Sequence, residues 1–310
     1  LSARTRDFTN AGFFYSISGS VSDNEHYTSQ TIGLNWRPVD PVSVYAAWGK
    51  TAKFPGTAAY YNNVGQTNAS GQTVVVPLHV SPEYVRDIEA GVRYEQGGFQ
   101  GAVNLYRENF ANTFVQTTDP TSGLSSTANG GSSRYEGAEL DLQDSLRTSF
   151  GGFSIYGNVA ENKAYFTSGF TVSNSSGVSA TAGQTVHSGQ PLAGVPKHLA
   201  NLGVGWKWQG WRVNVSEHYS GSQYVNEYNA GVPAAETIPS YAVTNFTVRD
   251  TVHIGDGLWK DVKLALYVDN VLNRHYYTFG YGDTTVDNTP FVRAIYEEPR
   301  AYFASATVDF

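Results

Sequence analysis

The chain has 310 residues, enough for one large domain or two ordinary ones with a sizeable buried core. Its formal net charge of -7 argues against a nucleic-acid partner, and the absence of cysteine excludes disulfides and cysteine-ligated metal sites. No apolar run approaches the roughly 18–20 residues of a membrane-spanning helix, so a helical membrane protein is excluded. A membrane-spanning β-barrel stays open, because polar side chains facing its interior lower the mean hydropathy, which is -0.33 here.

From one end to the other, the sequence repeats a period of two, with apolar residues on one face and mostly polar residues on the other. This period predicts β-strands. Counting all such segments gives about twelve antiparallel strands, most of them long enough to cross a bilayer at a tilt of about 45°. They include residues 13–17, 42–49, 87–94, 201–208, 211–216, 242–249, 262–269 and 300–310.

Charged residues occupy the polar face of several predicted strands. In the dry core of a soluble sandwich such charges would be intolerable, whereas in a water-filled lumen they cost little. The sequence therefore favours a transmembrane β-barrel. These charged residues could form ion-pair ladders on the lumen wall or steer a charged substrate, and the ladders are favoured. They are Glu89, Arg93, Glu139, Asp141, Lys207, Arg249 and Asp269.

The connections between predicted strands alternate in length. Short turns are expected at residues 37–41, 95–98, 147–152, 209–210 and 253–257. Long polar loops are expected at residues 53–81, 110–133, 167–197, 222–239 and 273–297. Short turns on one side and long loops on the other are typical of a bacterial outer-membrane barrel, with the turns in the periplasm and the loops outside.

Aromatic residues mark the strand ends. The last strand alternates over its whole length and ends in Phe310, and we expect the barrel-assembly machinery to read this terminal aromatic. The six tryptophans lie near short turns or strand ends, which predicts an interfacial aromatic belt. They are Trp36, Trp48, Trp206, Trp208, Trp211 and Trp259.

Seven short motifs, in order along the chain, resemble those of TonB-dependent outer-membrane receptors. Residues 44–55 (VYAAWGKTAKFP) are similar to a strand-to-loop segment of that family, and residues 81–91 (SPEYVRDIEAG) and 135–142 (YEGAELDL) to two of its strands. The other four are residues 194–202, which contain GVPKH and NL, then 240–243 (SYAV), 269–277 (DNVLNRHYY) and 298–300 (EPR). Each motif is weak alone, but together they make the resemblance specific.

The resemblance implies a receptor that imports a scarce, large nutrient, most often a ferric siderophore, with energy from the TonB complex. The family closes a 22-stranded barrel around an N-terminal plug. No plug is recognisable here, so residues 1–310 are expected to be a single, partial barrel domain, the C-terminal half of such a barrel. The alternative is a passive, porin-like channel of about twelve strands.

Aromatic side chains in the predicted external loops are the candidate ligand-binding residues, because exposed apolar rings there are unusual unless something docks on them. Iron chelates carried by the family are often aromatic, which suits tyrosine, although tyrosines also decorate barrel rims. No cofactor, metal site or catalytic residue is predicted; an outer-membrane hydrolase using His187 and Ser188 has no supporting motif. The loop candidates are Tyr60, Tyr61, Tyr224, Tyr228, Tyr276, Tyr277, Phe279 and Tyr281.

Overall fold

The computed structural model describes residues 4–12, 15–23, 26–55, 63–67, 73–77, 80–118, 125–171, 185–225, 237–255, 260–284 and 290–309. Every helix or strand assigned in these ranges is a β-strand, which confirms the all-β prediction. Within the same ranges, no helix is long and apolar enough to cross a membrane.

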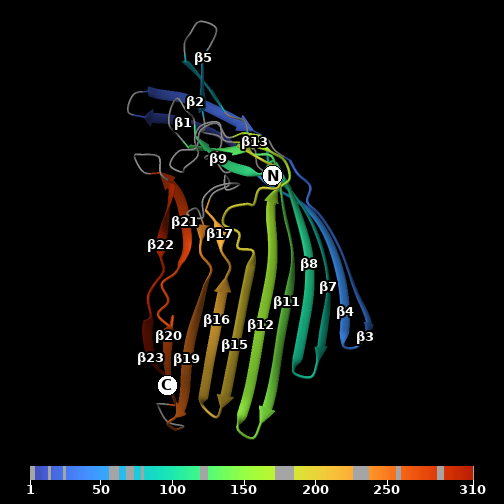
Figure 1. Ribbon diagram of the computed structural model, residues 1–310, viewed down its shortest axis with the longest axis vertical. Helices are drawn as coiled ribbons and strands as arrows, with labels where there is room; N and C mark the ends of the chain where they lie inside the picture. Colours follow the sequence, from blue (N-terminus) through green and yellow to red (C-terminus); the bar gives the residue numbers. More distant parts are fainter. Residues whose placement is uncertain are drawn as a thin grey trace.

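Eleven strands form one antiparallel sheet, the wall of the molecule (Figure 1). They lie across the sheet in chain order, so each wall strand pairs with the wall strands before and after it in the chain, and β3 and β23 form the two edges. The strands are β3 (Gln30–Val39), β4 (Val42–Lys53), β7 (Glu83–Gln96), β8 (Phe99–Ala111), β11 (Ser132–Thr148), β12 (Gly151–Phe166), β15 (His198–Trp208), β16 (Trp211–Ser220), β19 (Tyr241–His253), β20 (Asp261–Asp269) and β23 (Ala301–Asp309).

The connections alternate in length, as predicted. Two-residue turns join β3 to β4, β7 to β8, β11 to β12 and β15 to β16, and residues 254–260 join β19 to β20. The other connections are long: residues 54–82, 112–131, 167–197, 221–240 and 270–300. The short turns and the C-terminus lie at one end of the wall, and the long connections gather at the other, the loop end (Figure 1).

Each long connection carries a hairpin that the sequence did not predict. The pairs are β5 (Asn63–Thr67) with β6 (Thr73–Pro77), β9 (Phe114–Thr118) with β10 (Ser125–Asn129), β13 (Phe170–Thr171) with β14 (Thr185–Val186), β17 (Gln223–Tyr224) with β18 (Thr237–Ile238), and β21 (Tyr277–Thr284) with β22 (Pro290–Tyr296).

One more hairpin, β1 (Arg4–Gly12) with β2 (Tyr15–Asp23), precedes the wall. The predicted first strand, residues 13–17, lies partly outside the described residues. Its described part belongs to β2, so the wall has eleven strands where about twelve were expected. Alternation predicts an extended segment but does not tell a wall strand from a loop hairpin.

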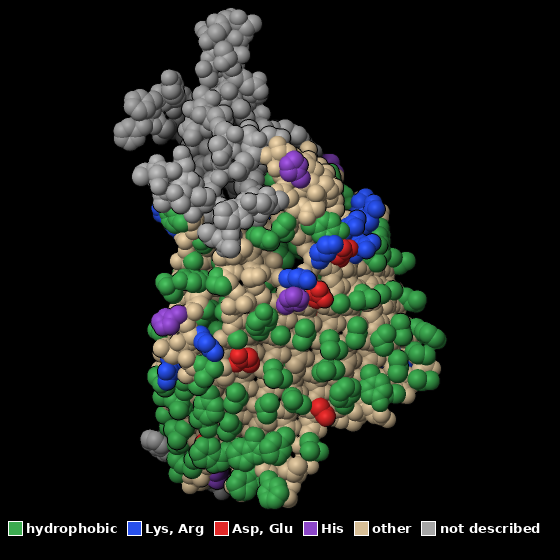
Figure 2. Space-filling model, viewed as in Figure 1, with side chains coloured by type: hydrophobic (Ala, Val, Ile, Leu, Met, Phe, Trp, Pro, Cys, Tyr) green, Lys and Arg blue, Asp and Glu red, His purple; other side chains and the backbone are tan. Residues whose placement is uncertain are grey.

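The pairing register gives the wall an apolar outer face. Residues that are partners across neighbouring strands share a face, and Val44, Val92, Val103, Leu140 and Val159 are consecutive partners over five strands. Although they lie in the middle of the sheet, Val103 is 47% and Val159 51% exposed. Hydrophobic side chains cover much of the wall in Figure 2. Such a face is stable against hydrocarbon and not against water.

The buried apolar side chains lie at the loop end. Ala164, Phe166, Val186 and Leu192 form a cluster there, in which Phe166 and Val186 are fully buried. The wall strands, by contrast, make their extensive contacts with their neighbours in the sheet and not with a second layer. A sandwich would bury one face of each sheet, so the structure confirms the barrel wall over the soluble sandwich.

The seven charged residues predicted to point inward all lie on the inner face, opposite the apolar residues. The ion-pair ladders expected among them are absent: all seven are described residues, and no ion pair joins two of them. The Arg93 guanidinium lies 4.4 Å from the Tyr45 ring centroid, and Glu139 Oε2 accepts a hydrogen bond from Asn104 Nδ2 at 3.3 Å. Arg93 therefore has an aromatic neighbour and Glu139 an amide neighbour in place of an oppositely charged one.

Two inward tyrosines reach over a glycine on the next strand to bind an asparagine on the strand beyond. Tyr45 is the partner of Gly91, and its hydroxyl donates to Asn104 Oδ1 at 2.9 Å. In the same way, Tyr106 is the partner of Gly137, and its hydroxyl donates to Asn162 Oδ1 at 2.7 Å. The glycines leave the space that the rings occupy, since a Cβ on Gly91 would lie 2.5 Å from Cζ of Tyr45.

Four tryptophans lie on the outer face near the two-residue turns, as an interfacial belt requires: Trp36, Trp206, Trp208 and Trp211. The Trp206 indole Nε1 donates to the carbonyl of Phe150 in the neighbouring turn at 2.9 Å. Trp48 shares the outer face but lies further toward the loop end. Trp259 lies outside the described residues.

Candidate functional site

The structure describes the side chains of half of the predicted loop aromatics. Tyr276 directly precedes β21, Tyr277 and Phe279 lie at its start, and Tyr224 lies in β17. Tyr281 lies in β21, where its backbone pairs with β22. The remaining predicted residues lie outside the described part of the chain: Tyr60, Tyr61, Tyr228 and the assembly residue Phe310.

A stack of rings joins Tyr276 to the inner face of the wall. The ring centroid of Tyr276 lies 4.7 Å from that of Tyr241, at the start of β19, with an interplanar angle of 34°. The Tyr241 ring lies 5.9 Å from the imidazole of His218 on β16. Both Tyr241 and His218 face inward in the register. Three rings therefore lead from the loop into the lumen.

Amide side chains continue this line along the inner wall. His218 Nδ1 and Asn201 Oδ1 lie 2.7 Å apart, within hydrogen-bond distance, and Asn201 Nδ2 donates to Asn158 Oδ1 at 2.8 Å. The line thus crosses β16, β15 and β12. The sequence reasoning did not select these residues, although their inward positions in alternating strands are a signal that could have found them.

A second pair of rings borders a cavity between the last two long connections. The centroids of Tyr277 and Tyr296 lie 4.5 Å apart. The cavity has a volume of about 350 Å³, and its lining comes from β18, β21 and β22 and includes both rings. Gln223 Nε2 donates to the carbonyl of Thr278 at 3.0 Å, which ties β17 to β21. With Tyr296 65% and Phe279 58% exposed, these loops present large apolar rings to the outside.

Asn270 anchors the connection that carries these rings. Its φ of 51° is left-handed, which asparagine tolerates better than most residues. Its buried side chain accepts a hydrogen bond from the Arg274 amide at 2.7 Å and donates to the Arg274 carbonyl at 2.8 Å. Asn273, also at a φ of 51°, accepts from the Arg300 amide at 3.0 Å. The motif at residues 269–277 thus fixes both ends of the long connection.

Two phenols of the site, Tyr276 and Tyr277, have a raised pKa. Burial, followed by the nearby Glu297 carboxylate, raises the pKa of Tyr276 above its ordinary value. The hydrogen bond with Tyr296 raises the pKa of Tyr277 in the same direction. Neutral rings with hydroxyl donors can stack on an aromatic ligand and donate to its oxygen atoms.

The described contacts do not support the hydrolase that was considered from the sequence at His187 and Ser188. The Ser188 hydroxyl donates to the Thr167 carbonyl at 3.1 Å, and the described contacts include none between this hydroxyl and an imidazole. Within the described ranges, no three His, Asp or Glu side chains gather in a way that could hold a metal ion.

A curved antiparallel wall, apolar outside and polar inside, with short turns at one end and long connections at the other, is that of an outer-membrane-type β-barrel. The chain belongs to the family of TonB dependent receptor-like β-barrels, whose family model matches residues 2–271. The resemblance read from the seven motifs is thereby confirmed.

Known relatives and solved structures support this assignment. A probable TonB-dependent siderophore receptor, PiuA of Acinetobacter baumannii, is 24% identical over 270 residues, 84% of this chain and 32% of PiuA. The ferric yersiniabactin uptake receptor FyuA of Yersinia pestis superposes with a TM-score of 0.66 at 16% identity, over 98% of this chain and 41% of that one. For BauA, the ferric preacinetobactin receptor of A. baumannii, the TM-score is 0.57 at 18% identity, over 97% and 38%.

At these identities the structural likeness shows the fold. The chain spans about a third of the length of PiuA and less than half of each of the two receptors of known structure.

Proposed function

We propose that this chain is the C-terminal barrel portion of a bacterial outer-membrane receptor that takes up a ferric siderophore, with energy supplied through TonB. The family is one of transport receptors. The names of the relatives support the substrate class, since PiuA is a probable siderophore receptor and FyuA takes up ferric yersiniabactin. In this proposal the protein binds and passes its cargo and is not an enzyme.

The observation that carries the proposal is the line of rings formed by Tyr276, Tyr241 and His218. It starts in an outer connection and ends on the inner wall, where amide side chains continue it. A ferric chelate with aromatic groups would stack on Tyr276 and Tyr277 at the mouth. The polar inner wall would then receive it after its release from the loops.

The edges of the wall indicate how the barrel closes. Unpaired backbone groups on β3 and β23 would cost several kcal/mol each in hydrocarbon, so further strands should pair with them. We place residues 1–310 as a single partial barrel domain, about half of a 22-stranded barrel. A plug domain would gate the lumen and contact TonB, and the barrel-assembly machinery would read Phe310.

The test is uptake of ⁵⁵Fe-labelled catecholate, hydroxamate and carboxylate chelates by cells that express the receptor, with and without TonB. Tyr276→Ala should weaken chelate binding about three- to tenfold, since one aromatic pair contributes that much. Tyr302→Ala is the matched control, because Tyr302 is an exposed tyrosine on the outer face of β23. Deleting residues 273–297 should abolish binding but leave membrane insertion intact.

Two results would contradict the proposal. If uptake persists in cells without TonB, and the purified protein conducts ions steadily in a planar bilayer, the protein is a passive channel. If the deletion of residues 273–297 leaves binding of all three chelates unchanged, the aromatic loop is not the receptor site.

A further inference from the structure

The outer face of the wall changes from apolar to cationic within three rows of paired residues, counted toward the loop end. The lowest row is apolar on four strands, with Ala46, Ala90, Leu105 and Ala138 on β4, β7, β8 and β11, and it ends in Glu161 on β12. The next row contains Trp48, Ile88, Arg107, Glu136 and Lys163, and the one above it Lys50, Arg86, Asn109, Arg134 and Tyr165. In Figure 2, Lys and Arg side chains gather near the loop end at the edge of the hydrophobic surface.

This basic surface, defined by Lys50, Arg86, Arg107, Arg134 and Lys163, has an excess of positive charge. Its two rows hold five cations and one carboxylate, Glu136, which pairs with Arg107 Nε at 3.1 Å. Among the described residues, the other four cations form no ion pair. Lys163 Nζ instead lies 4.8 Å from the Tyr165 ring centroid, and Arg134 Nε donates to Asn109 Oδ1 at 2.8 Å.

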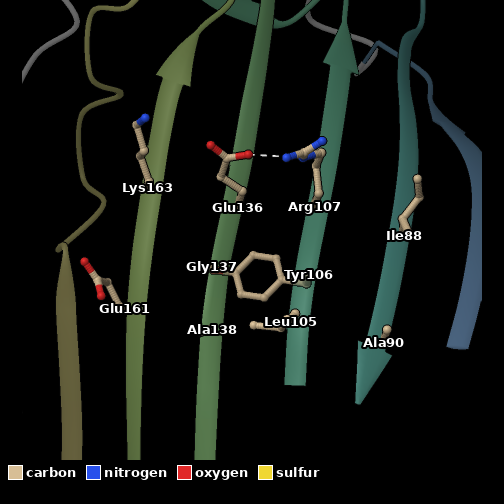
Figure 3. Close-up of a pocket in the computed structure, with 10 residues that line it drawn as sticks. All are labelled: Ile88, Ala90, Leu105, Tyr106, Arg107, Glu136, Gly137, Ala138, Glu161 and Lys163. Carbon is tan, nitrogen blue, oxygen red and sulfur yellow. Dashed lines mark hydrogen bonds and ion pairs between the residues drawn. The ribbon is translucent and has the colours of Figure 1, made fainter. Parts of the chain in front are cut away.

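A hollow of about 560 Å³ lies across the boundary between the apolar and cationic rows (Figure 3). Its apolar part is lined by Ile88, Ala90, Leu105 and Ala138. Glu161 also lines the hollow, and its carboxylate pairs with Lys197 Nζ at 3.5 Å. Arg107, Glu136 and Lys163 lie on the side toward the loop end, with the Glu136–Arg107 pair between two neighbouring strands. One ligand could therefore contact both a hydrocarbon surface and several cations.

The position of the basic surface on the outer face of the wall indicates which kind of ligand it binds. The outer face below the basic surface meets acyl chains, so the basic surface lies at the height where lipid headgroups begin. Long basic side chains at such an interface extend to the headgroup region, and clusters of them bind anionic headgroups. A phosphate group complements the four cations that lack a carboxylate partner, and its acyl chains complement the apolar row.

We propose that the basic surface binds the phosphorylated headgroup of an anionic lipid in the outer leaflet, with an acyl chain lying along the apolar part of the hollow. The headgroup lies among the guanidinium groups of Arg86 and Arg134 and the ammonium groups of Lys50 and Lys163, the four cations of the surface that have no carboxylate partner among the described residues. The site is on the lipid-facing side of the wall, away from the lumen and the loop aromatics, and is independent of the transported ligand.

Native mass spectrometry of the purified protein in non-ionic detergent, titrated with dioleoylphosphatidic acid, tests the proposal. The triple variant Lys50→Gln/Arg86→Gln/Lys163→Gln should bind on the order of 100-fold more weakly, because each cation near an anionic headgroup contributes about fivefold. The matched control is Lys207→Gln/Arg212→Gln/Arg249→Gln, which removes three cations from the inner face near the turns. These three residues are partners in the register of neighbouring strands. Dioleoylglycerol, which has no phosphate, should not bind detectably to the parent protein or to either triple variant.

The outcomes separate the lipid site from general charge effects. Equal loss in the inner-face control, or unchanged binding in the outer-face triple variant, would overturn the proposal. Full competition by an equal concentration of inorganic phosphate would overturn it too, because the site would then bind the anion and not the lipid. If the triple variant does not fold, as judged by heat-dependent gel mobility, Lys50→Gln and Lys163→Gln alone should each weaken binding about fivefold.

Discussion

Gly91 marks a point on the inner wall where a side chain has no room. A Cβ at this position would lie 2.5 Å from Cζ and from the hydroxyl oxygen of Tyr45, closer than real Cβ contacts. In Gly91→Ala the ring must turn away. It then loses the 2.9 Å hydrogen bond to Asn104 and its place under the Arg93 guanidinium. Overpacking costs about 1–3 kcal/mol and a lost hydrogen bond about 1 kcal/mol, so we expect a destabilisation of about 2–4 kcal/mol.

Gly33→Ala is the matched control. Gly33 also faces inward, on β3, but a Cβ there would find its nearest atom, the Ala46 carbonyl oxygen, at 3.8 Å. This is an ordinary contact, so the substitution should change stability by less than about 0.5 kcal/mol. The assay is urea unfolding of the protein in detergent micelles, followed by the mobility difference between folded and unfolded protein on gels.

A double-mutant cycle identifies the cause. In a Tyr45→Ala background the ring is gone, so Gly91→Ala should cost almost nothing, and the coupling free energy should account for most of the single-variant loss. If Gly91→Ala costs the same with and without the Tyr45 ring, or if it behaves like Gly33→Ala, the steric reasoning is wrong.

Three further predictions concern single contacts. Asn270→Ala should destabilise residues 270–300 by about 2–4 kcal/mol, measured by hydrogen exchange, whereas Asn270→Asp, which keeps the acceptor, should cost less than half of that. Burial and Glu297 raise the folded-state pKa of Tyr276, so its contribution to stability is present below about pH 10 and is lost as the pH rises through that pKa. The free energy of unfolding of Tyr276→Phe should therefore change less between about pH 9 and pH 11 than that of the parent protein. Trp206→Phe should cost about 1 kcal/mol of unfolding free energy in urea, because it keeps the apolar ring but loses the hydrogen bond to the Phe150 carbonyl; an unchanged value would exclude a role for that bond.

The period of two in the sequence predicted the faces of the wall correctly. Glu139 and Leu140 are neighbours in the chain, and their opposite faces follow from alternation alone. The seven inward charges and the alternation of short turns with long connections were found in the same way. Motif order then added the family, which the match over residues 2–271 confirms.

The contacts that the sequence did not predict depend on the register in which neighbouring strands pair. Tyr45 meets Gly91 only because β4 and β7 pair in one particular alignment, and no local pattern states that alignment. The prediction of ion-pair ladders was wrong for the same reason, since the register brings the Arg93 guanidinium to the ring of Tyr45. The ring stack also escaped notice, because His218 lies on a wall strand and Tyr276 in a distant connection.

The two-residue turns at one end of the wall have a consequence for how such receptors diverge. Each turn locks the alignment of its two strands, so length added at the opposite end cannot slide one strand past another. Whole hairpins, such as β9 with β10, could then be exchanged between receptors while the inward and outward faces of the eight strands joined by these turns are preserved. New cargo specificity can be acquired in this way without redesigning the part that meets the membrane.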